Sequence, residues 1–228
     1  MPSSIKDINS DVLWDLEGIA IGAYIKRFNY PWEALPGLKD FILDLGQSLD
    51  KTQYKQLGED IWVEKTAIID PSASITGPCI IGAHSEIRHN AYIRGSVYIG
   101  SHSVIGNASE VKNAILLDHV EVPHFNYVGD SILGHYSHLG AGAITSNVRG
   151  DKKTVTVKAG EEVLDTGLRK FGALLGDRVE IGCQTVINPG SVIGKDSRIY
   201  PLVLLRGVIP AKSLVKSDGV VVAIREEH

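Results

Sequence analysis

The sequence predicts an all-β solenoid, a left-handed parallel β-helix of hexapeptide repeats with a small N-terminal helical cap. Every sixth residue from 69 to 117, and again from 175 to 205, is isoleucine, leucine or valine, a pattern typical of repeat architectures. A small residue commonly precedes each aliphatic by two positions, and glycine often follows it. Each hexapeptide should therefore form a flat strand with one inward aliphatic and then a tight corner. Three such sides close one coil, so positions that are three hexapeptides apart should stack.

The repeat is interrupted in the middle of the chain. Pro123 occupies a position at which an aliphatic residue is due, and a shifted phase resumes at Tyr127, Leu133 and Leu139. Near residues 148–171 the pattern is lost in a polar, charged segment. A long loop inside a compact domain is often functional, so we expect a loop or β-hairpin that protrudes from the coil.

The N-terminal segment 1–60 lacks the hexapeptide pattern and is expected to be helical. Ser10 can cap a helix that runs to Ile25, and a second helix is predicted at Leu38–Leu49. We interpret residues 1–60 as a helical cap that shields the first coil, because an open coil end exposes a sheet edge. Residues 61–228 then form the β-helix domain.

Composition argues against several classes of function. The formal net charge of −4 argues against a broad basic surface for nucleic acid. We expect no secretory signal and no membrane span, since acidic residues break the N-terminal apolar stretch and no run of roughly 18 apolar residues occurs. The two cysteines, Cys79 and Cys183, favour reduced thiols and a cytoplasmic location.

Two groups of residues suggest chemistry. Arg94 and Lys112 are three hexapeptides apart within an unbroken phase, so they should project from the same edge of the prism. They could hold a phosphate by charge-assisted hydrogen bonds, or they could be a solvated surface pair. His124 follows Pro123 at the break and could take a proton near neutral pH, with Glu110 to orient it. A histidine that merely fills a corner is the simpler reading of His124 alone.

Three segments in the middle of the chain carry a specific resemblance. They are Glu110-Val111-Lys112, His124-Phe125-Asn126-Tyr127-Val128-Gly129-Asp130 and Gly140-Ala141-Gly142-Ala143-Ile144-Thr145-Ser146-Asn147. With their spacing, they resemble the acetyltransferase half of the bifunctional glucosamine-1-phosphate acetyltransferase / N-acetylglucosamine-1-phosphate uridyltransferase, a member of the hexapeptide-repeat acyltransferase family. The resemblance runs from about Ile75 to Pro210.

The resemblance implies roles for four of the residues already singled out. His124 matches the general base of that family, and Glu110 matches the acidic residue near it. Arg94 and Lys112 match residues that bind the sugar phosphate, in agreement with the stacking argument.

The resemblance also implies contacts with the sugar. Tyr127 and Asn147 match sugar-contacting positions. The sequence departs from the family at His138, where the family has asparagine, and at Val148, where it has tyrosine. Both positions line the sugar site, so these departures put the identity of the acceptor in doubt.

Three further residues are implied on the donor side and in the loop. Ala141 matches a position whose backbone contacts the acyl donor, and Cys183 falls at another donor-side position. The family also uses a lysine shortly after Asn147. Counting forward selects Lys153, whereas counting back from the resumed coil selects Lys170, which we prefer because it adjoins that coil.

The implied activity is transfer of an acetyl group from acetyl-CoA to the amine of a small sugar phosphate such as glucosamine-1-phosphate. The acceptor would attack the thioester directly, without an acyl-enzyme and without a metal. The resemblance also implies a homotrimer with active sites between neighbouring prisms. The uridyltransferase half is expected to be missing, because the segment 1–60 is too short for a nucleotide-binding domain and lacks its glycine-rich signature.

Two other functions fit the same fold. Hexapeptide β-helices include γ-class carbonic anhydrases, which bind zinc through histidines, and His84, His119 and His124 have suggestive spacing. The separation of His84 from His119 is one residue short of two full coils, which should place them on different faces. The chain could instead be a non-catalytic hexapeptide-repeat scaffold, with the altered sugar-site residues as a sign of lost activity.

Overall fold

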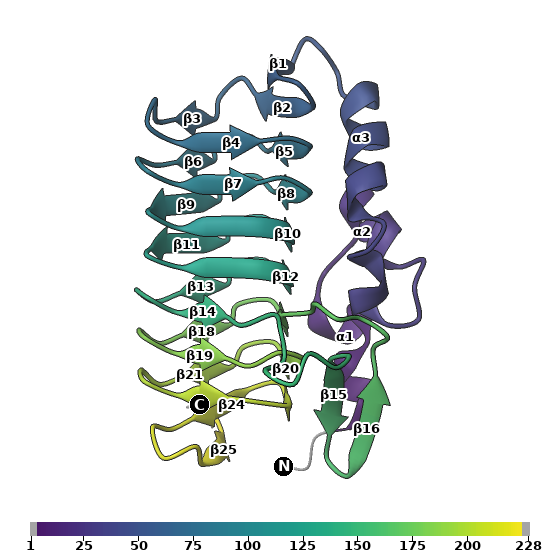
Figure 1. Ribbon diagram of the computed structural model, residues 1–228, viewed down its shortest axis with the longest axis vertical. Helices are drawn as coiled ribbons and strands as arrows, with labels where there is room; N and C mark the ends of the chain where they lie inside the picture. Colours follow the sequence, from purple (N-terminus) through teal and green to yellow (C-terminus); the bar gives the residue numbers. More distant parts are fainter. Residues whose placement is uncertain (1–3, 225–228) are drawn as a thin grey trace, which may run out of the picture.

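The computed structural model describes residues 4–224, and it confirms the left-handed parallel β-helix. The coil has three sides, numbered here in chain order, and each is a ladder of short parallel strands (Figure 1). Side 1 contains β2 (Ile61–Glu64), β5 (Cys79–Ile81), β8 (Val97–Ile99), the second halves of β10 (Glu110–Leu116) and β12 (Tyr127–Leu133), β17 (Ala173–Leu175), β20 (Ser191–Ile193) and β23 (Val208–Ile209).

Sides 2 and 3 complete the coil. Side 2 contains β3 (Ile68–Ile69), β6 (Glu86–Ile87), β9 (Val104–Asn107), β11 (Glu121–His124), β13 (His138–Leu139), β18 (Glu180–Ile181), β21 (Arg198–Ile199) and β24 (Ser213–Val215). Side 3 contains β4 (Ser74–Thr76), β7 (Tyr92–Arg94), the first halves of β10 and β12, β14 (Ile144–Thr145), β19 (Val186–Ile187) and β22 (Leu204–Leu205).

The predicted inward aliphatics form the core, but the phase changes earlier than expected. Val111 pairs with Ile93, which precedes it by exactly three hexapeptides, whereas Leu116 pairs with Ile99, one position short of that spacing. The corner between Val111 and Leu116 is therefore one residue shorter than the corner above it. As a result, Leu117 leaves the coil interior. It packs in a second cluster of buried apolar residues outside the coil, called the outer apolar cluster. The expectation of an unbroken phase up to Leu117 was wrong.

The short corner also explains Pro123. In the shifted phase Val122 pairs with Ile105 and points into the core, so Pro123 is already a corner residue. Val128, rather than Tyr127, is the next inward residue. The break in the repeat is a shortened corner at Asn113, which recurs one coil later at Asp130 between Val128 and Leu133, and Pro123 is not its cause.

The N-terminal helices cover side 1 and do not lie over the first coil. They are η1 (Ile5–Ile8), α1 (Ser10–Leu13), α2 (Ala20–Ile25), η2 (Pro31–Ala34) and α3 (Leu38–Ser48), and they run along the length of the prism (Figure 1). Trp14 and Trp32 are buried in the outer apolar cluster with side-1 residues that point out of the coil, such as Ile115 and Ile132. The coil thus stabilises the helices through a second apolar face.

The two helix predictions had different outcomes. The second helix, α3, forms almost as expected. The first is split into α1 and α2 by a non-helical segment. Trp14, at the start of that segment, donates its indole N–H to the Leu175 carbonyl at 2.7 Å.

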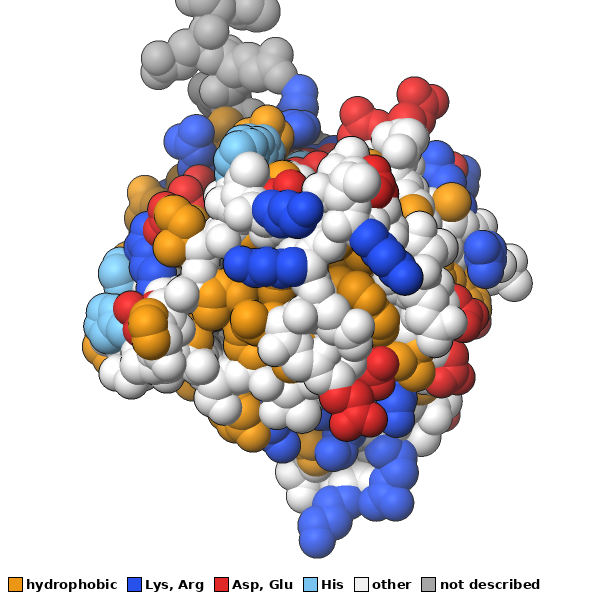
Figure 2. All heavy atoms as spheres, turned by 90° about the horizontal axis from the view of Figure 1, so that it is seen from above, with side chains coloured by type: hydrophobic (Ala, Val, Ile, Leu, Met, Phe, Trp, Pro, Cys, Tyr) orange, Lys and Arg blue, Asp and Glu red, His pale blue; other side chains and the backbone are white. Residues whose placement is uncertain are grey.

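The end of the first coil is covered only in part. The strand β1 (Tyr54–Gly58) pairs antiparallel with β2. Figure 2 looks onto this end and shows apolar side chains exposed between lysine and arginine side chains. A hollow of about 400 Å³ there is lined by Ile69 and Ile75, which are partly buried and pack against the core.

The interruption predicted near residues 148–171 is a β-hairpin. It leaves the coil after Asn147 and contains β15 (Thr156–Ala159) and β16 (Glu162–Asp165), paired antiparallel. Its Val155, Val157 and Ala159 are buried in the outer apolar cluster, so the hairpin folds back beside the lower coils instead of protruding freely (Figure 1). The strand β25 (Val221–Ala223) pairs antiparallel with β24 at the other end of the coil.

Candidate functional site

Most of the predicted site residues lie along side 3 and the two corners that bound it. The corner between sides 2 and 3, called corner 2–3, carries His124, Ala141 and Cys183 in successive coils. The corner between sides 3 and 1, called corner 3–1, carries Lys112 and Asn147. Arg94 lies at the same corner one coil before Lys112, because Ile93 pairs with Val111, whereas Glu110 and Tyr127 lie on side 3 itself.

His124 is presented to solvent by a rigid corner. Its backbone N–H donates to Asn126 Oδ1 at 2.9 Å, and its carbonyl accepts from the Gly142 N–H at 2.9 Å. Asn126 is 3% exposed and donates to the carbonyls of Gly140 and Ala143 in the next coil. Because both the oxygen and the NH₂ group of this buried amide are hydrogen-bonded, the amide holds the corner in place. Asn126 lies within the motif around His124, but the sequence pattern does not reveal this role.

The two donor-side residues stack below His124 on corner 2–3. The Ala141 carbonyl accepts from the Gln184 N–H at 2.8 Å, which ties its coil to the coil of Cys183. Within residues 4–224 the Ala141 N–H donates to no protein acceptor. Cys183 is an exposed free cysteine. The corner therefore presents an unused backbone donor one coil from the exposed histidine.

The predicted contact between Glu110 and His124 is not formed. Glu110 accepts instead from Arg94 Nη1 at 2.6 Å. This bond raises the pKa of the Arg94 guanidinium above its usual value. Both side chains are substantially exposed, so the pair is held weakly and can open.

The second cation, Lys112, is also paired with a carboxylate. Its ammonium donates to both oxygens of Asp130 at 3.1 Å. Asn147 donates to Asp130 and also to the Tyr127 hydroxyl at 3.2 Å. Burial and the Asp130 charge raise the pKa of Tyr127. The expected repulsion between two stacked cations is therefore absent, because Glu110 and Asp130 each neutralise one.

His138 and Lys170 are not brought into direct contact with the other predicted residues. His138 lies on side 2, where its Nδ1 is 3.0 Å from Glu180 Oε2. Lys170 is exposed at the end of the hairpin segment. The next residue, Phe171, donates its N–H to the Asn147 carbonyl at 2.9 Å, so Lys170 adjoins Asn147, whereas Lys153 precedes the first hairpin strand. Val148 is 44% exposed beside them.

The structure corrects the argument used against a zinc site. His84, His102 and His119 stack on one corner, between sides 1 and 2, with ring centroids 4.8 and 4.7 Å apart. His84 and His119 share a face because the shortened corner at Asn113 lies between His102 and His119. His124 is on another corner, and residues 4–224 contain no group of three or more His, Cys, Asp or Glu able to hold a metal.

Comparisons with known proteins identify relatives of this chain. The family model of the GMPPB C-terminal domain matches residues 75–166. The uncharacterized acetyltransferase YaiX of Escherichia coli O6:K15:H31 is 31% identical over 220 residues, which cover 86% of this chain and 94% of YaiX. The chain belongs to the hexapeptide-repeat acetyltransferase family. The bifunctional protein GlmU of Methanococcus aeolicus is 31% identical to this chain over 221 residues, which cover 93% of the chain and 52% of GlmU.

A third relative is the bifunctional sugar-1-phosphate nucleotidylyltransferase/acetyltransferase of Sulfurisphaera tokodaii. It is 37% identical over 112 residues, which cover 49% of this chain and 28% of that protein. The chain spans about half the length of the GlmU relatives it matches. Among the helices of residues 4–224, none has the length and apolar character needed to cross a membrane.

Proposed function

We propose that the protein transfers an acetyl group from acetyl-CoA to the amine of a sugar phosphate such as glucosamine-1-phosphate. The observation that carries this proposal is the composition of side 3. One bounding corner presents an exposed histidine, and the side and the other corner present a guanidinium, an ammonium, a phenol and an amide. These are a base and a set of phosphate and hydroxyl partners, the groups that this reaction needs.

In the proposed reaction the acceptor amine attacks the thioester carbonyl. A C–N bond forms, the C–S bond breaks, and His124 takes the proton released by the amine and passes it to the departing CoA thiolate. The unused Ala141 N–H, one coil away, is suited to hold the donor or its oxyanion. Cys183 is an exposed free thiol and is assigned no covalent role.

The phosphate is proposed to bind by exchange of ion-pair partners. The exposed Arg94 can turn from Glu110 to the ligand at little cost, since exposed pairs contribute only about 0–1 kcal/mol. Lys112 keeps Asp130 on its buried side and offers the phosphate its remaining N–H. Selection of phosphorylated over free sugar follows from these two cations.

We further propose a homotrimer in which side 3 meets a neighbouring prism. Side 3 and corner 2–3 expose large apolar side chains, with Phe125 at 61%, Leu202 at 75% and Leu204 at 73%. Leu202 and Leu204 lie in one coil, and burial against a neighbouring prism would remove their apolar surface from water. In such a trimer, side 2 of one prism, with His138, would face side 3 of the next, with Tyr127. Analytical ultracentrifugation should give three times the 24.7 kDa chain mass. Cys79 and Cys183 are both free thiols, which supports a cytoplasmic location.

The test is a coupled assay of CoA release with acetyl-CoA and glucosamine-1-phosphate. His124→Ala should lower turnover by roughly 10²–10⁴-fold without loss of fold. The matched control is His89→Ala, which removes another exposed histidine from the same corner two coils earlier. It should leave turnover unchanged. A folded His124→Ala protein with parental turnover would overturn the base assignment, and a parent that neither binds acetyl-CoA nor releases CoA would favour a scaffold.

A further inference from the structure

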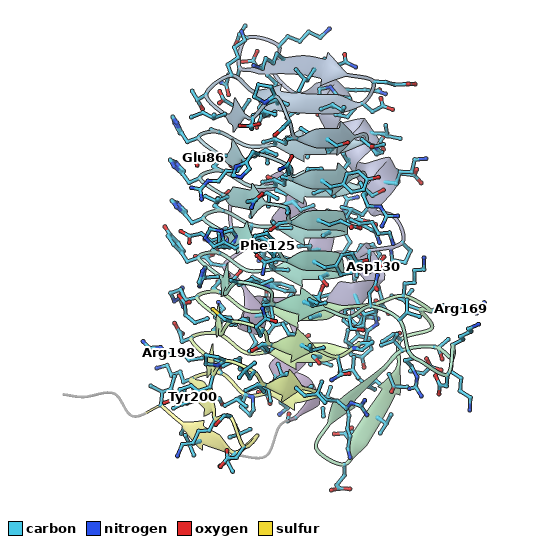
Figure 3. All side chains as sticks on the ribbon, turned by 60° about the vertical axis from the view of Figure 1, so that its left-hand side comes forward. Glu86, Phe125, Asp130, Arg169, Arg198 and Tyr200 are labelled. Carbon is cyan, nitrogen blue, oxygen red and sulfur yellow. The ribbon has the colours of Figure 1, made fainter. Side chains whose placement is uncertain are left out.

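The most highly connected polar side chain near the site is one that the sequence analysis did not select. The Asp130 carboxylate is 4% exposed and lies in β12 at corner 3–1, at the base of the hairpin segment (Figure 3). Oδ1 accepts from Lys112 Nζ at 3.1 Å and from Asn113 Nδ2 at 2.8 Å. Oδ2 accepts from Lys112 Nζ at 3.1 Å and from the Asn147 amide. Four bonds from three donors therefore saturate one buried carboxylate.

These donors come from different coils. Lys112 precedes Asp130 by one coil, and Asn147 follows it by one. Asn147 also holds the Tyr127 hydroxyl at 3.2 Å. Three of the predicted acceptor-binding residues thus depend on a single anion for their positions.

Asp130 also fastens both ends of the hairpin segment. Its side chain holds Asn147, where the segment leaves the coil, and its carbonyl accepts from the Gly172 N–H at 2.8 Å, where the segment returns. Lys170 lies two residues before Gly172. This second contact is made by the backbone of Asp130, so it should persist in Asp130→Asn.

We propose that Asp130 is a positioning residue of the acceptor site, which orients Lys112, Asn147 and Tyr127 for the sugar phosphate. This inference rests on the proposed function. A lysine ammonium has three N–H groups and rotates freely on a flexible stem. Because Asp130 engages the buried side of the ammonium, the remaining N–H is directed outward, where the phosphate would bind.

Asp130→Asn is the informative substitution because it keeps the shape and removes the charge. An amide has one oxygen and one NH₂ group. Whichever way it turns, its NH₂ faces two donors, either Lys112 with Asn113 or Lys112 with Asn147. The array must open, so the dissociation constant and KM for glucosamine-1-phosphate should rise on the order of 10-fold or more. The KM for acetyl-CoA should not change.

Asp177→Asn is a closely matched control. Asp177 is also buried, with its carboxylate 1% exposed and 3.4 Å from Lys195, whose side chain is as exposed as that of Lys112. It accepts from the N–H groups of Asp15 and His135 at 2.8 and 2.9 Å, at a corner away from side 3. The control should lower the melting temperature and leave acceptor affinity at the parental value.

A double-substitution cycle separates positioning from general destabilisation. In a Lys112→Met background, Asp130→Asn should raise the acceptor KM much less than it does in the parent, because the shared partner is gone. Equal effects in both backgrounds would overturn the proposal. So would parental acceptor affinity in Asp130→Asn.

Binding is measured by calorimetry with glucosamine-1-phosphate and with glucosamine, alongside turnover. Asp130→Asn should reduce the preference for the phosphorylated sugar. A parent that binds the sugar phosphate without transferring acetyl would refute the proposed reaction and leave the Asp130 inference supported by the variant affinities. A parent with turnover whose acceptor affinity is unaffected by Asp130→Asn would refute the inference alone. A parent that shows neither binding nor transfer would refute both.

Discussion

Gly106 is the residue at which coil packing can be linked most directly to the position of His124. It lies one coil before Pro123, in a column where β9 and β11 pair and Asn107 is the partner of His124. A Cβ on Gly106 would lie 2.5 Å from the Pro123 Cα and would overlap the Pro123 carbonyl. Carbon atoms pack comfortably at about 3.5–4.0 Å, so Gly106→Ala must push the two coils apart locally by at least ~1 Å.

The energetic cost can be worked from these contacts. Overpacking typically costs about 1–3 kcal/mol, and the upper end applies because the obstacle is backbone. Replacing glycine where the backbone tolerates alanine returns about 0.4–1 kcal/mol through the unfolded chain. The net loss should be about 2 kcal/mol, which corresponds to a fall of roughly 4–8 °C in melting temperature. Because the displaced peptide carries His124, turnover should fall up to about 100-fold.

Differential scanning calorimetry and the CoA-release assay test this prediction together. Gly150→Ala is the control, because a Cβ there meets nothing within 4 Å. It should change neither quantity. If Gly106→Ala melts and turns over like the parent, the coils relax without cost, and the claim that their spacing sets the His124 position is wrong.

Three further predictions concern other parts of the molecule. Arg94→Ala and Lys112→Ala should each weaken acceptor binding by about 1.5–3 kcal/mol in KM measurements, but only Lys112→Ala should also lower the melting temperature, because it leaves a buried carboxylate unpaired. Burial and the neighbouring imidazoles lower the pKa of His119 in the stacked corner, so the stability present above its unfolded pKa of about 6.5 should be lost as the pH falls below that value. In a plot of melting temperature against pH, His119→Phe should flatten the region below about pH 6.5, whereas His89→Phe, outside the stack, should not. Identical plots for the parent and His119→Phe would contradict the claim that His119 causes this loss of stability. Trp14→Phe should destabilise the fold by about 0.5–1.5 kcal/mol in chemical denaturation, because it removes the indole hydrogen bond to the Leu175 carbonyl, which then keeps only the Gly134 N–H as its donor. An unchanged midpoint would show that the indole bond is dispensable.

The sequence by itself determined the coil. Aliphatics at every sixth position can share one interior only if three short strands close each turn, so residues such as Ile93 and Val111 were placed correctly. The motif around His124 and the run ending at Asn147 identified side 3 and its corners as the candidate site. The α3 helix and the interruption near residues 148–171 were also predictable, because both lack the hexapeptide pattern.

Other features depended on the tertiary structure. A corner that omits one residue leaves the local sequence plausible in either phase, and only the pairing of Leu116 with Ile99 shows where it occurs. The helices follow side 1 because outward residues such as Ile115 supply a second apolar face, which a count of inward positions does not reveal.

The pairing of charges was likewise decided in three dimensions. Arg94 is 16 residues from Glu110, and Lys112 is 18 residues from Asp130. These partners meet because neighbouring coils lie only about 4.8 Å apart, so a side chain reaches across a coil boundary as easily as along its own strand. Stacking of like charges could be anticipated from the period. The carboxylates that neutralise these cations, and the burial of Asp130, could be seen only in the folded chain.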